Sequence, residues 1–228
     1  MALKLYGDYV SPYTVMVAFT LKEKELNYEL VNVQLFKGKR SDLIRPRNPY
    51  AKVPIIEFDE PDQKTITVYE SRAICRFLAL KFKDLGTPLL PPPDDFEAIA
   101  RFEEAAAAEV HYLFPHVSTY TKEKLVHRIL GVPVSEEKLK SAVSDLKATL
   151  GIADKLMEGK LYFAGENISL VDIWWAVGIY ALLSIERDWL FDLPNLSAWW
   201  ARIEDRPAWK ATLEIIEGHW LKASQTAV

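Results

Sequence analysis

Apolar positions follow two different spacings in the first part of the chain. Short runs rich in β-branched and aromatic residues alternate with segments whose apolar residues recur every three or four positions. Strands are predicted at Leu3–Tyr6, Tyr28–Gln34, Pro54–Phe58 and Thr65–Tyr69, and helices at Pro12–Lys24 and Ser71–Phe82. Turn-forming residues 59–63 lie between the last two strands and favour a hairpin. The resulting order is β-α-β followed by β-β-α.

The rest of the chain shows only helical spacing. Helices are predicted at Phe96–Leu113, ending before Pro115, and at Ser135–Met157, Leu196–Ile203 and Ala208–Ile216. Ser169 and Asp172 are placed as a capping box before a further apolar segment, Ile173–Leu183, which is predicted to be a buried helix. The proline-rich residues 86–95 cannot continue a helix and separate the two parts of the chain.

These patterns predict two domains. Residues 1–83 have the element order of a thioredoxin-like α/β domain, residues 84–95 are a linker, and residues 96–228 are an all-α domain. The chain has 228 residues, of which 50% are apolar, so there is enough material for a substantial core.

Composition and charge narrow the functional classes. The net charge of −4 and the lack of a Lys/Arg-rich block argue against nucleic-acid binding. The apolar run Ile173–Leu183 is too short to cross a bilayer, and the polar N-terminus is unlike a secretory signal, so we expect a cytoplasmic protein. The single cysteine, Cys75, excludes an internal disulfide, and the four histidines lack metal-ligand spacing, so no metal is expected.

Ser11 stands between the first predicted strand and the first predicted helix, directly before Pro12. A serine before proline is a favoured N-cap, because proline suits the first helical position. The same place can hold an anion, since the free N–H groups and the helix dipole both favour negative charge. Ser11 could therefore be a simple cap or the donor that stabilises a bound thiolate.

Two further motifs lie at element ends in the first domain. In Val53-Pro54, proline opens a strand and leaves Val53 extended, so that its backbone can pair with a peptide-like ligand. In Glu70-Ser71, Ser71 is expected to cap the next helix and hold a carboxylate, while Glu70 could bind an ammonium group. A ligand that used all the motifs would carry a thiol, a peptide backbone, a carboxylate and an amine, as glutathione does. Taken singly, each motif is more simply explained as a cap or a turn.

The order of these motifs along the chain resembles that of the cytosolic glutathione transferases. The shared pattern comprises Ser11, Asn48-Pro49 with Val53-Pro54, Glu70-Ser71-Arg72, the proline-rich connection, the Ser169–Asp172 box, Pro194–Trp199 and Arg206-Pro207-Ala208. The serine-type phi class is the most similar, although Val15-Met16 and Lys52 stand where that class usually has other residues.

This resemblance implies an enzyme, a glutathione S-transferase that activates the glutathione thiol for conjugation to hydrophobic electrophiles in detoxification. It implies Ser11 as the catalytic hydrogen-bond donor to the glutathione sulfur. The residues implied to bind glutathione, the co-substrate, are Lys39, Arg40, Lys52, Val53, Pro54, Glu70 and Ser71. Those implied to line an electrophile pocket between the domains are Tyr9, Val10, Tyr112, Phe114, His116 and Tyr120. The family also implies a homodimer.

Three alternatives stay open at this point. Tyr6, at the end of the first predicted strand, is the rival donor, because other classes of the family use a tyrosine near that place. The same thiolate could also reduce peroxides. Finally, the fold could serve a non-catalytic ligand-binding or regulatory protein, although such relatives usually carry extra domains.

Overall fold

The computed structural model describes residues 3–35, 40–60 and 64–225. It divides into two compact units, one formed by Met1–Leu90 together with Asp205–Val228 and the other by Pro91–Glu204. The C-terminal helix therefore belongs to the first unit, whereas the sequence boundaries grouped every residue after 95 together.

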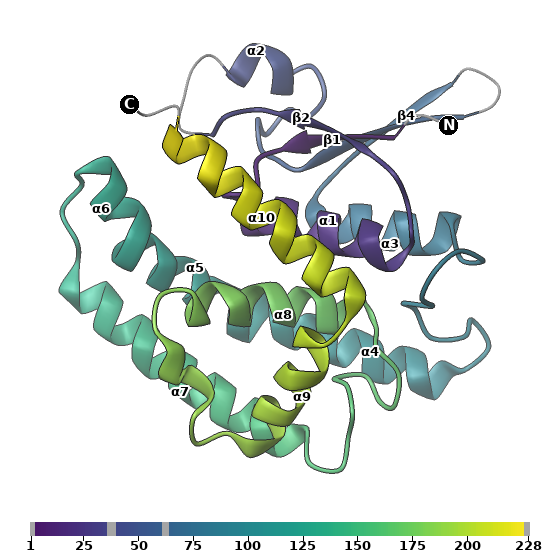
Figure 1. Ribbon diagram of the computed structural model, residues 1–228. Coiled ribbons are helices and arrows are strands. Elements are labelled where there is room, and N and C mark those ends of the chain that lie inside the picture. The colour runs from purple at the N-terminus through teal and green to yellow at the C-terminus, as the bar shows by residue number, and fades with distance from the viewer. Residues whose placement is uncertain (1–2, 36–39, 61–63, 226–228) are drawn as a thin grey trace. The chain divides into compact units, whose positions relative to one another are not determined.

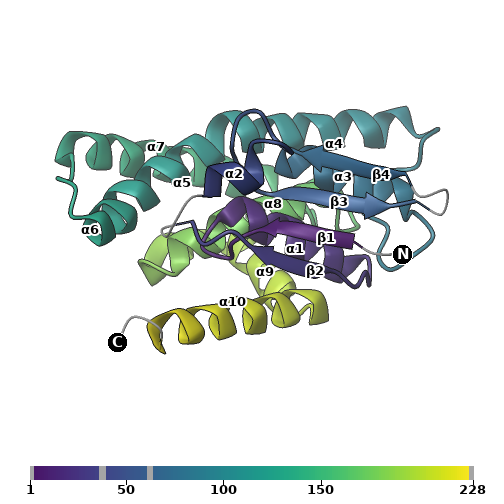
Figure 2. The same cartoon turned by 90° about the horizontal axis from the view of Figure 1, so that it is seen from above.

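A four-stranded sheet is the centre of the first unit. Its strands are β1 (Leu3–Gly7), β2 (Glu29–Asn32), β3 (Ile55–Asp59) and β4 (Thr65–Tyr69), and they lie in the order β2-β1-β3-β4 (Figure 2). β1 pairs in parallel with β2 and antiparallel with β3, while β3 and β4 form the predicted antiparallel hairpin. The predicted α/β order is confirmed.

Helices cover both faces of this sheet. α1 (Pro12–Glu23) and α3 (Ser71–Lys81) pack together on one face, and the short α2 (Arg40–Ile44) lies on the other (Figure 1). Side chains alternate across the sheet, so Leu5 belongs to the face opposite that of its neighbour Tyr6. Tyr6 packs with Ile44 of α2 and Ile55 of β3 in a buried apolar cluster.

The C-terminal helix α10 (Pro207–Gln225) packs against α1 (Figure 1). Trp209 lies against Phe19, with 5.0 Å between the ring centroids. Arg206, directly before α10, binds the buried Glu23 carboxylate through two nitrogens, and its Nη2 lies 2.7 Å from Oε2 of Glu23. A buried ion pair of this geometry, together with the aromatic contact, makes α10 part of the first unit.

The second unit is helical throughout. Its elements are α4 (Phe96–Ala108), η1 (Glu109–Leu113), α5 (Phe114–Thr121), η2 (Lys122–Val126), α6 (His127–Leu130), α7 (Glu136–Leu156), α8 (Leu170–Leu183), η3 (Arg187–Leu190) and α9 (Pro194–Glu204). The prediction that the first of these helices ends before Pro115 is wrong. In the π-helical turn η1, the Phe114 N–H donates to the carbonyl of Glu109. This wider turn interrupts the α-helical ladder directly before Pro115, which has no N–H to donate, so the helical path continues.

The capping box at the start of α8 is confirmed. One Asp172 oxygen accepts from the Ser169 N–H at 2.8 Å, and the other accepts from the Phe163 N–H and from Nε1 of Trp199. Burial raises the pKa of Asp172, while these hydrogen bonds act in the opposite direction. The carboxyl group thus joins the start of α8 to α9 and to the loop before it.

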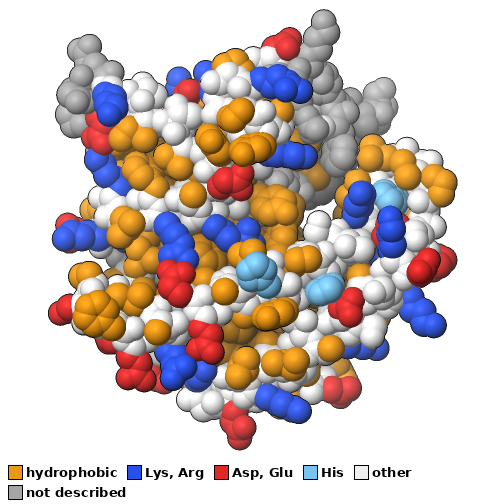
Figure 3. Space-filling view, turned by 180° about the vertical axis from the view of Figure 1, so that it is seen from behind, with side chains coloured by type: hydrophobic (Ala, Val, Ile, Leu, Met, Phe, Trp, Pro, Cys, Tyr) orange, Lys and Arg blue, Asp and Glu red, His pale blue; other side chains and the backbone are white. Residues whose placement is uncertain are grey.

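Charges of both signs are mixed on the surface. Lys and Arg side chains are interspersed with Asp and Glu over the face shown in Figure 3. Among the described residues, no helix is both long and apolar enough to span a membrane.

Candidate functional site

A cavity of about 510 Å³ opens within the first unit. Its lining residues come from the start of α1, the segment before β3, the start of α3, and the region of α2. They are Ser11, Tyr13, Leu35, Ile44, Asn48, Ala51, Lys52, Val53, Pro54, Glu70, Ser71 and Arg72. The structure thus brings all three sequence motifs to one cavity.

Ser11 occupies the N-cap position of α1 but does not act as a side-chain cap. Its backbone is extended, Pro12 follows at the start of the helix, and its hydroxyl makes no capping hydrogen bond. The Ser11 N–H donates to the carbonyl of Asp8 at 2.9 Å, which fixes the turn before the helix. Among the described residues the hydroxyl has no partner, so it is available to a ligand in the cavity.

The segment before β3 presents backbone groups to the cavity. The Val53-Pro54 peptide bond is cis, and the Val53 backbone has no hydrogen-bond partner within the described part of the chain. The buried Asn48 supports this segment, because its Nδ2 donates to the Lys52 carbonyl at 2.9 Å and its Oδ1 accepts from the Tyr50 N–H at 3.0 Å. The sequence pattern places Asn48 within a motif but does not reveal this supporting role.

The backbone of Glu70 is strained. Its φ is 72° and ψ is 113°, a region that non-glycine residues rarely occupy. The expected N-cap, Ser71, is instead the first residue of α3, and Glu70 takes the N-cap position. Strain of this kind concentrates at ligand sites, where the rest of the structure enforces it. The Glu70 carboxylate is exposed and, among the described residues, has no partner.

The basic residues of the predicted site are placed unevenly. Lys52 lines the cavity and is exposed, and its ammonium group has no partner in the part of the chain that the structure describes. Lys39 lies outside the described residues. Arg40 begins α2, but its side chain is likewise outside what is described. Arg72, the last residue of the Glu70-Ser71-Arg72 motif, also lines the cavity.

Tyr6 is engaged away from this cavity. Its hydroxyl donates to Oε2 of Glu57, whose other oxygen accepts from Nε of Arg47 at 2.8 Å. The Arg47 guanidinium also lies over the Tyr6 ring, 4.6 Å from its centroid. Burial and the hydrogen bond to Glu57 raise the pKa of Tyr6. A hydroxyl that is bound to a carboxylate is a poor candidate donor for a thiolate.

Of the residues expected to line an electrophile pocket, two lie in the first unit. Tyr9 is buried, and its hydroxyl lies 2.7 Å from that of Tyr28. Burial and this contact raise the pKa of Tyr9 well above its ordinary value. Val10 is half-buried.

The other four residues of that set lie in the second unit and differ in exposure. Phe114 and Tyr120 are buried in its core, and burial, helped by Glu186, raises the pKa of Tyr120 to about 12. Tyr112 is exposed, and Nδ1 of the half-buried His116 lies 3.5 Å from Asp145. The pocket assignment stays a prediction.

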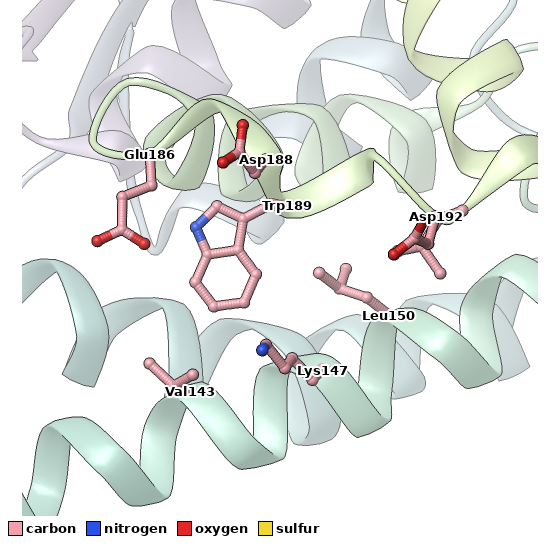
Figure 4. Close-up of a pocket in the computed structure, with 8 residues that line it drawn as sticks. Val143, Lys147, Leu150, Glu186, Asp188, Trp189 and Asp192 are labelled. Carbon is pink, nitrogen blue, oxygen red and sulfur yellow. The ribbon is translucent and has the colours of Figure 1, made fainter.

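A second cavity, of about 400 Å³, lies within the second unit between α7 and the η3 segment (Figure 4). It is lined by Val143, Lys147, Leu150, Glu186, Asp188, Trp189, Asp192 and Leu193. The Glu186 carboxylate is already bound by Nζ of Lys124 at 2.8 Å. None of the predicted site residues lines this cavity. Among the described residues, no group of three or more His, Cys, Asp or Glu is arranged to hold a metal.

Family models match both parts of the chain. The "Glutathione S-transferase, N-terminal domain" matches residues 5–86, and the "Glutathione S-transferase, C-terminal domain" matches residues 106–207. Glutathione S-transferase hmp2 of Hypomyces subiculosus is 34% identical over 94% of this chain and 99% of its own length. The chain belongs to the glutathione S-transferase family. Glutathione S-transferase F13 of Arabidopsis thaliana is 31% identical over 91% of this chain and 93% of its own length.

The solved structures agree with this family assignment. Glutathione transferase F7 from Populus trichocarpa superposes with a TM-score of 0.84 and is 30% identical over 93% of this chain and 98% of its own. The predicted phi type and the two-part fold are confirmed. The named relatives also support a glutathione S-transferase activity rather than the non-catalytic alternative.

Sequence reasoning missed several residues of this glutathione S-transferase cavity. Asn48, Ala51 and Arg72 lie inside the quoted motifs, so the motif itself was the available signal. Leu35 and Ile44 carry no such signal, because an apolar residue near a strand or helix end is most simply explained by core packing.

Proposed function

We propose that the cavity of the first unit binds glutathione and that the Ser11 hydroxyl donates a hydrogen bond to its sulfur. The observation that carries this proposal is the convergence of unpaired polar groups on one cavity. The Ser11 hydroxyl, the Val53 backbone and the Glu70 carboxylate come from three separate segments, and none of these groups has a partner among the described residues. Such groups are costly to leave unpaired unless a ligand or solvent satisfies them.

The chemistry follows from the ionisation of a thiol. A free thiol has a pKa of about 8.5 and reacts as the thiolate. A hydroxyl donor and the N-terminus of α1 both stabilise the thiolate, and a fall of about two pH units in its pKa corresponds to about 2.7 kcal/mol. In this proposal Ser11 is neither nucleophile nor base, because the sulfur of glutathione attacks the electrophile itself.

The remaining parts of glutathione match the remaining groups of the cavity. We assign the cysteinyl backbone to Val53, held beside the cis Pro54, and the γ-glutamyl end to Glu70 and Ser71. Ser71 lies in the first turn of α3, where the free N–H groups of a helix favour a carboxylate. Lys52 is assigned to the glycyl carboxylate, and so are Lys39 and Arg40 from the basic loop that follows β2 in the sequence.

The second substrate is proposed to be a hydrophobic electrophile, and a homodimer in the cytoplasm is the proposed working form. Both come from the family to which the chain belongs. The use of the same thiolate to reduce peroxides remains a second expectation, and no observation in the structure favours it.

Substitution of the two rival donors tests the assignment. We expect Ser11→Ala to lower kcat with glutathione and chlorodinitrobenzene by about 100-fold, similar to the loss of one aligned donor in other active sites. Glutathione affinity, measured by calorimetry, is expected to change much less, because most contacts to the peptide remain. Tyr6→Phe is the matched control, and kcat is expected to stay within about three-fold of wild type. The reverse pattern would show that Tyr6 is the donor.

A further inference from the structure

The loop that carries Ser11 is held by a buried carboxylate, that of Asp8. Its Oδ1 accepts from the Val10 N–H at 3.1 Å, and its Oδ2 accepts from the Leu35 N–H at 2.9 Å. The Asp8 carbonyl accepts from the Ser11 N–H. Ser11 and Leu35 both line the cavity, so Asp8 connects two segments of the cavity wall.

A third contact to this carboxylate comes from the C-terminal helix. Nε2 of His219, in α10, lies 2.8 Å from Oδ1 of Asp8. Asp8 is only 4% exposed, so this contact is shielded from solvent more than a surface pair would be. α10 itself is anchored on α1 through Trp209 and Arg206, as described above.

His219 also contacts the residue next to Asp8. Its ring meets that of Tyr9 edge to face, with 5.7 Å between the centroids, and the Tyr9 hydroxyl is fixed in turn by that of Tyr28. Two neighbouring residues of the loop are therefore held by one side chain of α10. Asp8 and Tyr9 directly precede Val10 and Ser11, so the contacts of His219 fall on the backbone that leads into the N-cap.

We propose that Asp8 and His219 are positioning residues, through which the C-terminal helix sets the direction of the Ser11 hydroxyl. This inference rests on the proposed role of Ser11. Neither residue lines the cavity, so they act through the loop of residues 8–11 and not by touching glutathione. The expected consequence is a loss of thiolate stabilisation when the contact is broken, with glutathione binding largely retained.

Three variants of the protein separate the contact with Asp8 from the ring contact with Tyr9. His219→Phe keeps a ring against Tyr9 and removes the nitrogen that contacts Asp8, whereas His219→Gln keeps a polar nitrogen. Asp8→Asn removes the charge and keeps one acceptor oxygen. Glu217→Gln, at an exposed position of the same helix, is the matched control. The measurements are kcat and KM with chlorodinitrobenzene, the pKa of the bound glutathione thiol, and the thermal unfolding midpoint.

We expect His219→Phe to lower kcat by about ten-fold, because it removes the 2.8 Å contact between Nε2 of His219 and the buried Asp8 carboxylate. The pKa of the bound thiol is expected to rise, and the KM for glutathione to change by less than about three-fold. His219→Gln is expected to recover most of kcat, and Glu217→Gln to match wild type. Asp8→Asn combined with His219→Phe is expected to lose less than the sum of the single changes, because both changes act on the contact between His219 and Asp8.

Several outcomes would overturn the inference. One is a His219→Phe variant that keeps the wild-type kcat and the wild-type pKa of the bound thiol. Another is an equal loss of kcat in His219→Phe and His219→Gln. A loss explained by the unfolded fraction, with an unchanged thiol pKa, would show a purely structural role. If Ser11→Ala itself leaves turnover unchanged, the proposed function and this inference both fail. Dependence on Ser11 without dependence on His219 overturns only the inference.

Discussion

At the scale of single residues, Ser11 shows how position and side chain can serve different purposes. Its backbone takes the N-cap position before Pro12, yet its hydroxyl makes no bond to the helix. The sequence could place Ser11 at a helix start, because Ser-Pro is a strong local signal. It could not decide whether the hydroxyl caps the helix, because that depends on a rotamer and on the cavity beside it.

Tyr6 and Glu70 show the same limit at other positions. The sequence left Tyr6 as a rival donor, since nothing local reveals that Glu57, fifty-one residues away, accepts from its hydroxyl. The strained backbone of Glu70 is equally hidden, because the rest of the fold imposes it. Long-range partners and backbone strain are set by tertiary packing, which motif spacing does not encode.

Asn48 gives a prediction at this scale. Asn48→Ala removes the buried amide that holds the Lys52 carbonyl and the Tyr50 N–H. We expect the KM for glutathione to rise by about ten-fold, because the backbone of the neighbouring Val53 loses its support, while kcat at saturation falls much less.

The matched control for Asn48 is Asn195→Ala, in the other unit. The Asn195 Nδ2 similarly donates to a backbone carbonyl, that of Asp154, at 3.0 Å. In both variants the free energy of unfolding, measured by denaturant titration, is expected to fall by about 1–3 kcal/mol. Only Asn48→Ala is expected to alter the KM, so a similar KM change in both would reject the specific role of Asn48.

At the scale of elements, local signals decided most of what the sequence could predict. The predicted alternation of strands and helices, the hairpin and the Ser169–Asp172 capping box are all present. Each of them is marked by residues that are close together in the sequence. The prediction that a helix ends before Pro115 failed for a physical reason. A π-helical turn directly before Pro115 accommodates the missing proline N–H, and no residue type marks such a turn in the sequence.

The start of α7 offers a pH-dependent prediction. The Ser135 N–H donates to the buried Glu123 carboxylate at 2.8 Å, and Nδ1 of His127 lies 3.0 Å from it. The Ser135 N–H, followed by His127, holds the pKa of Glu123 below its ordinary value of 4.5. The folded state therefore binds this proton more weakly than the unfolded chain. The ionised carboxylate stabilises the fold above pH 4.5, and this stabilisation is lost as the pH falls through the lowered pKa.

We accordingly expect Glu123→Gln to flatten the acid limb of the stability curve. The free energy of unfolding, measured with urea between about pH 6 and pH 3, is expected to fall less steeply than in wild type. Glu137→Gln, an exposed change in the first turn of α7, is the control and is expected to keep the wild-type slope. Equal slopes in wild type and Glu123→Gln would contradict the linkage.

At the scale of the whole molecule, the two structural units are not consecutive pieces of the chain. The candidate site lies entirely in the first unit, which also contains α10 from the far end of the sequence. The sequence predicted the thioredoxin-like order and the helical remainder, but a linear boundary could not show that α10 packs on α1. The ion pair between Arg206 and Glu23 joins residues 183 positions apart, beyond the reach of any local pattern.

The central claim is that this member of the glutathione S-transferase family stabilises the thiolate of glutathione through Ser11. The most direct test is the pKa of the thiol when glutathione is bound, read from thiolate absorbance across a pH titration of wild type and Ser11→Ala. We predict that the thiol bound to wild type ionises about two pH units below a free thiol, near pH 6.5, and that Ser11→Ala returns its pKa most of the way to about 8.5. The same thiol pKa in wild type and Ser11→Ala would contradict the account.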